Sequence, residues 1–185
     1  MWVKQRSSNI AHVSRLEGTE SMKQAGKLYL FCGKMAAGKS TLAREIAQRE
    51  NAVLIVQDEW LEQLFPDEIM NIPDFVKYSS RLQNVLTRHI TALLSQGVSV
   101  VLDFPGNTRL QREWFRALFE SAIADHELHY VDVSDEVCKR QLRERSNQLP
   151  EGSAFTSEAE FDAITKYFQE PSDDEGFNII RHVKA

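Results

Sequence analysis

Cysteine is scarce in this chain of 185 residues, which contains only Cys32 and Cys138. Two cysteines so far apart cannot supply the disulfide framework on which small secreted domains depend. Long apolar runs are also missing, since no stretch reaches the roughly eighteen consecutive apolar residues that span a bilayer. We therefore expect reduced thiols, a cytoplasmic location and no membrane contact, with Cys32 acting as a small buried apolar residue.

Positive charge does not predominate either. The chain has 22 lysines and arginines against 27 acidic residues, and its formal net charge is −5. This balance argues against bulk nucleic-acid binding driven by counterion release, although it leaves room for a local basic pocket. The five histidines show no spacing typical of metal ligands, so we assign them no metal role.

The first part of the chain lacks an organised pattern. Residues 1–25 are polar and irregular, without an apolar stretch long enough for a signal peptide. We expect them to form a flexible N-terminal extension. Residues 26–185 are enough for one domain with a stable core of its own.

The most specific pattern runs from Gly33 to Ser40 and reads Gly-Lys-Met-Ala-Ala-Gly-Lys-Ser. An apolar run at 27–32 precedes it and a helical pattern at 41–49 follows it, which is the context that a phosphate-binding loop requires. Gly33 and Gly38 allow the backbone to turn so that successive N–H groups point inward. The pattern therefore predicts binding of a nucleoside triphosphate.

Each part of this loop has an expected role in binding ATP and Mg²⁺. The loop amides and the positive end of the following helix would hold the phosphates. Lys39 would place its charge on the β- and γ-phosphates, and the Ser40 hydroxyl would ligate Mg²⁺. The expected nucleotide-binding residues are Gly33, Lys34, Met35, Ala36, Ala37, Gly38, Lys39, Ser40 and Thr41.

Apolar runs and helical patterns alternate along the rest of the chain. Continuous apolar runs typical of buried parallel strands lie at 27–32, 53–56, 98–102, 128–133 and 177–183. Helical patterns lie at 41–49, 74–96, 109–124 and 135–147, and a capping box at Ser157 opens a further helix that we expect to reach Phe168 and end at Pro171. This alternation predicts a three-layer α/β fold with a five-stranded, mostly parallel sheet and helices on both faces.

Two aspartates follow strands of the predicted sheet, and ligands of such folds bind at the carboxyl ends of strands. Asp58 comes after the second strand and before a helix, where it is either an N-cap or a general base or anchor for a substrate. Asp103 ends a Val-Val-Leu-Asp strand, where it either caps a helix or turn or serves as the second acidic partner of Mg²⁺. For both aspartates we favour the role in the ligand site over the role of a cap.

Arginines gather in two places. Lys139, Arg140, Arg143 and Arg145 lead into a polar stretch at 147–153, and we expect an arginine-bearing lid there that closes over a transferring phosphoryl group. Arg145 is the best single candidate, and an exposed charged helix is the alternative. Arg109 and Arg112 would either contact substrate or lie on a solvated helix face.

Together these motifs resemble the small P-loop kinases of the zeta-toxin, polynucleotide-kinase and chloramphenicol-phosphotransferase-like group. This group is classed with AAA-type ATP-binding domains, although its members are not ring motors. The resemblance covers about residues 26–182 and rests on the loop at 33–41, Asp58, residues 100–104 with Asn107 beyond them, and residues 138–147. It implies that Asp58 accepts the proton of an acceptor hydroxyl and that the lid arginines come from 140–145.

The chain departs from this group at two positions. The group often has arginine three residues after the strand-two aspartate, where this chain has Leu61, and Gln141 stands where a lid arginine is common. Our leading hypothesis is an Mg²⁺-dependent kinase that transfers the γ-phosphate of ATP to a small-molecule hydroxyl. The alternatives are an ATP-binding regulatory module without an acceptor, and a kinase of nucleotide or nucleic-acid 5′-hydroxyls.

Overall fold

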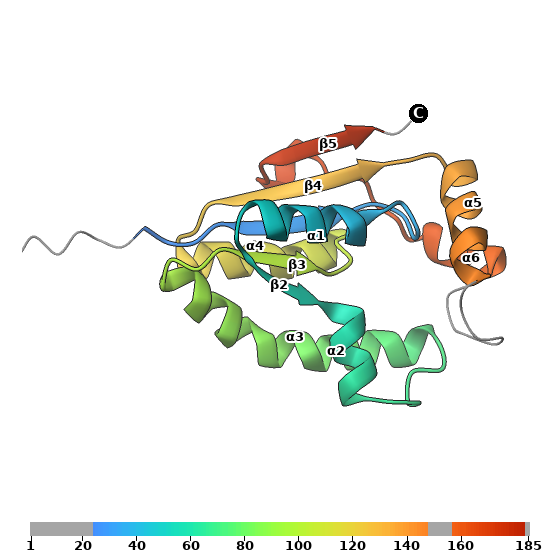
Figure 1. Cartoon of the computed structure of the whole chain (residues 1–185), viewed down its shortest axis with the longest axis horizontal. Coiled ribbons are helices and arrows are strands. Elements are labelled where there is room, and N and C mark those ends of the chain that lie inside the picture. The colour runs from blue at the N-terminus through green and yellow to red at the C-terminus, as the bar shows by residue number, and fades with distance from the viewer. Residues whose placement is uncertain (1–23, 148–156, 184–185) are drawn as a thin grey trace, which may run out of the picture.

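The computed structural model describes residues 24–147 and 157–183, in which five strands form one sheet (Figure 1). The strand order is β2-β3-β1-β4-β5, and all four pairings are parallel. This confirms the predicted sheet, with shifts of one or two residues at the strand ends. The strands are β1 Leu28–Cys32, β2 Val53–Val56, β3 Val100–Asp103, β4 His126–Asp132 and β5 Ile179–Val183.

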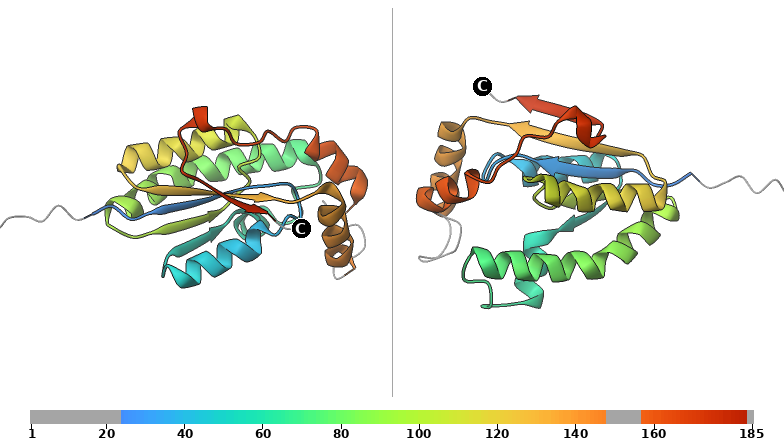
Figure 2. Two further views of the ribbon diagram at one scale, coloured as in Figure 1. Left: turned by 90° about the horizontal axis from the view of Figure 1, so that it is seen from above. Right: turned by 180° about the vertical axis from the view of Figure 1, so that it is seen from behind.

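Helices lie on both faces of the sheet, which confirms the three-layer fold. Figure 2 shows α3 and α4 together on one face and α1 on the other, while α5 and α6 lie beyond the carboxyl ends of the strands. The helices are α1 Lys39–Arg49, α2 Gln57–Leu64, α3 Ile72–Ser95, α4 Arg109–Ala122, α5 Asp135–Ser146 and α6 Glu158–Thr165, with a short 3₁₀ helix at Asp173–Glu175.

Strand β1 is central, and its sequence shows why. All five of its residues are buried, because both faces of the sheet are covered by helices at this strand. Leu28 and Leu30 join the core beneath α3 and α4. Tyr29 and Phe31 point to the other face and pack with residues of α1. An uninterrupted apolar run is what such two-sided burial requires.

The helix ends follow local capping chemistry. The Ser134 and Ser157 side chains accept hydrogen bonds from the backbone of α5 and α6, and the capping box predicted at Ser157 is confirmed. At α4, Thr108 and Gln111 form a further capping box. This box matters for the site, because it lies in the connection between β3 and α4.

The expected end of α6 is wrong. The helix stops at Thr165, before Phe168 and Pro171. A turn at 166–167 follows it, and the Gln169 N–H then donates to the Asn107 carbonyl at 2.9 Å. The Phe168 ring packs instead near Tyr130 of β4. A long-range contact has thus overridden the local helical pattern.

The stretch at 148–153 expected to belong to a lid, and most of the predicted N-terminal extension, lie outside the described residues. In the part of the chain that the structure describes, none of the helices combines the length and the apolar character needed to cross a membrane.

Candidate functional site

The predicted phosphate-binding loop lies between β1 and α1, at the carboxyl ends of the strands and facing α5 and α6 (Figure 1). Three of its residues adopt positive φ: Gly33 at 148°, Ala36 at 59° and Gly38 at 100°. A Cβ at Gly33 would stand 2.6 Å from the carbonyl oxygen of Val131 in β4. Glycine at this position therefore lets the loop begin close against the neighbouring strand.

The loop is also anchored to α5. The Lys34 side chain forms an ion pair with Asp135 in the first turn of that helix. Ala37 is buried with Cys138 and Leu142 of α5, and Met35 packs against the same cluster. These contacts fix the loop against α5, while Ser40 and Thr41 in the first turn of α1 stay exposed.

The side chain of Lys39 binds the backbone of the loop itself. Its Nζ donates hydrogen bonds to the backbone carbonyl oxygens of Gly33 at 2.6 Å and Lys34 at 2.8 Å. Burial lowers the pKa of the ammonium group, and nearby groups, Cys32 and then Asp103 foremost, act in the opposite direction. A desolvated cation beside the first turn of a helix is well placed to bind phosphate oxygens.

The side chains of Ser40 and Asp103 lie close enough to interact, and their role as ligands of Mg²⁺ stays a prediction. The Ser40 hydroxyl is near enough to the Asp103 carboxyl group to act on its pKa. Burial raises the pKa of Asp103, while Ser40 and the charge of Lys39 lower it. Asp103 ends β3, and the N-cap of α4 is Thr108, so the helix-cap reading of Asp103 is wrong.

The side-chain oxygen atoms of Ser40 and Asp103 fit Mg²⁺, which prefers oxygen ligands. This ion usually takes only one or two ligands from the protein and completes its coordination shell with water and phosphate oxygens. Within the described residues there is no cluster of three or more His, Cys, Asp or Glu side chains that would hold a metal ion by itself. Ser40 and Asp103 would therefore hold the ion together with the nucleotide.

Asp58 lies in the first turn of α2, one residue inside the helix. The N-cap position is Val56, so the reading of Asp58 as an N-cap is wrong. Asp58 is exposed to solvent. The protein atoms around its carboxyl group, and then the negative charge of Asp103, nevertheless raise its pKa, while Arg145 and Lys39 lower it. Asp58 thus interacts electrostatically with both Lys39 of the loop and Arg145 of α5.

The three arginines of α5 are used differently. Arg145 is exposed and its charge acts on Asp58. Arg143 forms an ion pair with Glu158 of α6, and Arg140 is exposed. Lys139 bonds Asp162 of α6 at 2.7 Å. The structure therefore connects Arg145 with the predicted site, whereas Arg143 and Lys139 join α5 to α6.

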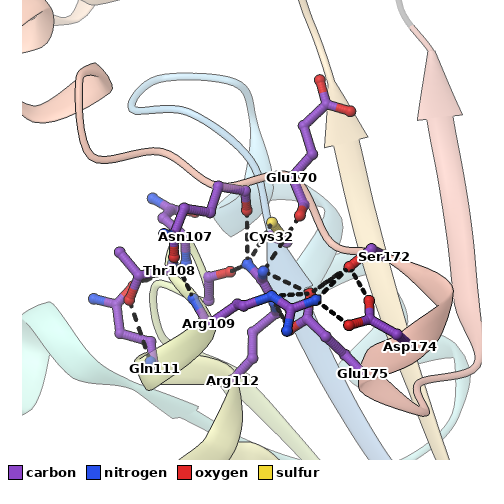
Figure 3. Close-up of polar contacts among 12 residues, drawn as sticks. Cys32, Asn107, Thr108, Arg109, Gln111, Arg112, Glu170, Ser172, Asp174 and Glu175 are labelled. Atoms are coloured by element: carbon purple, nitrogen blue, oxygen red, sulfur yellow. Dashed lines mark hydrogen bonds and ion pairs between the residues drawn. The ribbon is translucent and has the colours of Figure 1, made fainter.

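The sequence suggested that Arg112 contacts a substrate or lies on a solvated helix face. Its side chain does neither, because it is not exposed to solvent and does not reach the surface of the phosphate-binding loop. It is completely buried and forms an ion pair with Glu175 (Figure 3). Arg109 is exposed and pairs with Asp174.

The sequence patterns assigned no role to Asn107, whose Oδ1 accepts a hydrogen bond from the Gly33 N–H at 3.1 Å. The position of Asn107 just beyond Asp103 could have predicted this contact, because parallel strands end at the same edge of the sheet and the connection after β3 therefore lies near the end of β1.

Comparison with known proteins identifies the family of the chain. A family model described as an AAA domain matches residues 28–171. No curated protein matches the chain.

Solved structures with the same fold include three that illustrate its range. The Mycobacterium tuberculosis APS kinase in complex with AMPPNP and APS is 18% identical, with a TM-score of 0.58 over 86% of this chain and 88% of its own. A sugar kinase from Janibacter sp. HTCC2649 is 16% identical, with a TM-score of 0.57 over 85% of each chain. Chaetomium thermophilum Kti12 in complex with ADP-AlF3 is 14% identical, with a TM-score of 0.58 over 84% of this chain and 88% of its own.

Proposed function

We propose that this chain, which belongs to the AAA domain family and is a P-loop kinase-like ATP-binding domain, transfers the γ-phosphate of ATP to a hydroxyl group of a small molecule. The observation that carries the proposal is Asp58. It adds to the nucleotide-binding loop a carboxylate that interacts with Lys39, Asp103 and Arg145. A site for ATP binding alone has no need of such a group.

In this mechanism the acceptor oxygen attacks the γ-phosphorus, the bond to the bridging oxygen breaks, and ADP leaves. Asp58 takes the proton of the acceptor hydroxyl. Its raised pKa suits this role, because a base is more effective as its pKa approaches the working pH. Lys39 and the loop amides balance the charge on the phosphates. Mg²⁺ held by Ser40 and Asp103 would neutralise further phosphate charge.

The surroundings of Asp58 favour an uncharged or cationic acceptor. Helix α2 contains three acidic residues and no basic one. Leu61, at the position where related kinases often have arginine, is buried in the core, so it offers no anchor for a phosphate.

The test is a screen for transfer of radiolabelled γ-phosphate from ATP across pools of metabolites and oligonucleotides. We expect Lys39→Ala to abolish nucleotide binding, and Asp58→Asn to keep ATP binding but to slow transfer by about 100-fold or more. The matched control is Asp67→Asn, an exposed aspartate in the turn after α2, which should transfer at the wild-type rate.

Each rival function gives a different result in the same screen. Hydrolysis that no acceptor stimulates would favour a regulatory module, and transfer restricted to nucleotides or oligonucleotides would favour a 5′-hydroxyl kinase. Transfer at the wild-type rate by Asp58→Asn would remove the aspartate from the mechanism.

A further inference from the structure

Asn107 is held from several directions in the connection between β3 and α4. Its backbone N–H donates to Oε1 of Gln111 at 2.9 Å, and its carbonyl accepts from the Gln169 N–H at 2.9 Å. The preceding residue, Gly106, donates its N–H to the Phe31 carbonyl at 3.1 Å. Asn107 is therefore fixed relative to β1, α4 and the segment after α6 at once.

The side chain of this fixed residue supports the start of the phosphate-binding loop. Asn107 Oδ1 accepts the Gly33 N–H, while Lys39 Nζ donates to the Gly33 carbonyl oxygen. Both polar groups of Gly33 are thus engaged. Because Gly33 has a φ of 148° and no side chain of its own, these two hydrogen bonds help to fix the orientation of its peptide groups.

Arg112 lies behind this arrangement, and its guanidinium uses all five of its N–H groups (Figure 3). Nε and Nη2 donate to the Glu175 carboxylate at 2.7 and 2.8 Å. Nη1 donates to the carbonyls of Gly106 and Gln169, each at 2.8 Å, and Nη2 reaches the Glu170 carbonyl at 3.4 Å. One buried cation thereby joins the residue before Asn107 to the segment that bonds the Asn107 carbonyl.

We propose that Asn107 is a positioning residue of the nucleotide site, which sets the orientation of Gly33, and that the buried Arg112–Glu175 pair holds Asn107 in place. The inference rests on the proposed function only in that ATP is taken as the ligand. It assigns to the C-terminal segment 169–175 a part in phosphate binding, although that segment contributes no group to the phosphates.

The experiment measures the affinity of a non-hydrolysable ATP analogue with Mg²⁺ by calorimetry, and urea unfolding for each variant. Asn107→Ala should weaken binding about tenfold, since it leaves the Gly33 N–H without its acceptor. Glu175→Gln should weaken binding in the same direction by about threefold. Arg116→Ala is the matched control, because Arg116 is an exposed residue of the same helix whose ion-pair partner, Glu120, also lies in α4. It should bind like the wild type.

The double variant Asn107→Ala/Glu175→Gln separates positioning from general stability. If the pair acts through Asn107, Glu175→Gln causes no further loss of affinity once Asn107 is alanine. In a separate measurement on the protein without nucleotide, hydrogen exchange of the Gly33 amide should be faster in Asn107→Ala than in the wild type.

Unchanged affinity and unchanged Gly33 exchange in Asn107→Ala would overturn the role of Asn107. Independent, multiplying losses in the double variant would overturn the coupling to Arg112. Either result leaves wild-type nucleotide binding intact. A wild-type protein that does not bind the analogue would instead overturn the proposed function and the inference together.

Discussion

The ion pair between Arg112 and Glu175 gives the sharpest prediction on stability. The side chain of Arg112 is 0% exposed and that of Glu175 is 8% exposed. Glu175→Ala removes the acceptor of two guanidinium N–H groups and leaves a cation buried with backbone carbonyls as its remaining strong acceptors. Breaking a buried pair from one side costs about 3–5 kcal/mol, much of it from the charge left behind.

For a chain of this size, that loss corresponds to a fall in Tm of roughly 6 to 20 °C, at about 2–4 °C per kcal/mol. Urea denaturation followed by circular dichroism measures the free energy of unfolding directly. The control is Asp174→Ala, which removes the neighbouring exposed acid that pairs with Arg109 and should leave the midpoint unchanged. Replacing both partners, as in Arg112→Met/Glu175→Leu, removes the stranded charge but leaves the Gly106 and Gln169 carbonyls without their donor, so it should recover only part of the loss. A Glu175→Ala protein within about 1 kcal/mol of the wild type would refute the reasoning.

The same pair gives a dependence on pH with a definite sign. Burial acts to raise the pKa of Glu175, but hydrogen bonds from Arg112 and the backbone at Ser172, with the charge of Arg112, lower it overall. The stability that the carboxylate contributes is therefore present above its unfolded pKa and is lost as the pH falls through the lower folded value. Below that range, Glu175→Gln and the wild type should unfold at similar urea concentrations.

The remaining predictions concern the site and its support. The protein atoms around the Asp58 carboxyl group and the charge of Asp103 raise the pKa of Asp58, so transfer should slow as the pH falls through this raised value. Since ionising Asp58 then costs stability above that pH, Asp58→Asn should raise the urea midpoint at neutral pH. Asp103→Asn should increase the Mg²⁺ concentration needed for half-maximal turnover by about tenfold. Gly106→Ala would place a Cβ 2.6 Å from the Phe31 carbonyl and the Phe115 ring, which should lower the free energy of unfolding by about 1–3 kcal/mol.

Local patterns predicted the elements that depend on local chemistry. The apolar runs identified all five strands, because strands buried on both faces must be apolar throughout. The phosphate-binding loop and the neighbourhood of Ser40 and Asp103 followed from one motif and from the rule that parallel strands end at one edge. The family match at residues 28–171 agrees with that reading.

What could not be predicted depends on contacts between distant parts of the chain. The partner of Arg112 is 63 residues away, and an arginine in an amphipathic helix gives no sign of whether it will be buried. The early end of α6 has the same cause, since Gln169 leaves the helical path to bond Asn107. The placement of Asp58 inside α2 depends on where β2 ends, and element boundaries are the least certain part of a sequence reading.

The phosphate-binding loop is far in sequence from the segment 169–175 that supports it, and this has a consequence for synthesis in the cell. A ribosome makes Gly33 well before Gln169 and Glu175, and at roughly 5–20 residues per second the delay is on the order of ten seconds. During that interval the nascent chain has the complete phosphate-binding motif but lacks the segment that holds Arg112 and Asn107 in place. We expect the emerging chain to acquire firm nucleotide binding only after residue 175 has left the exit tunnel.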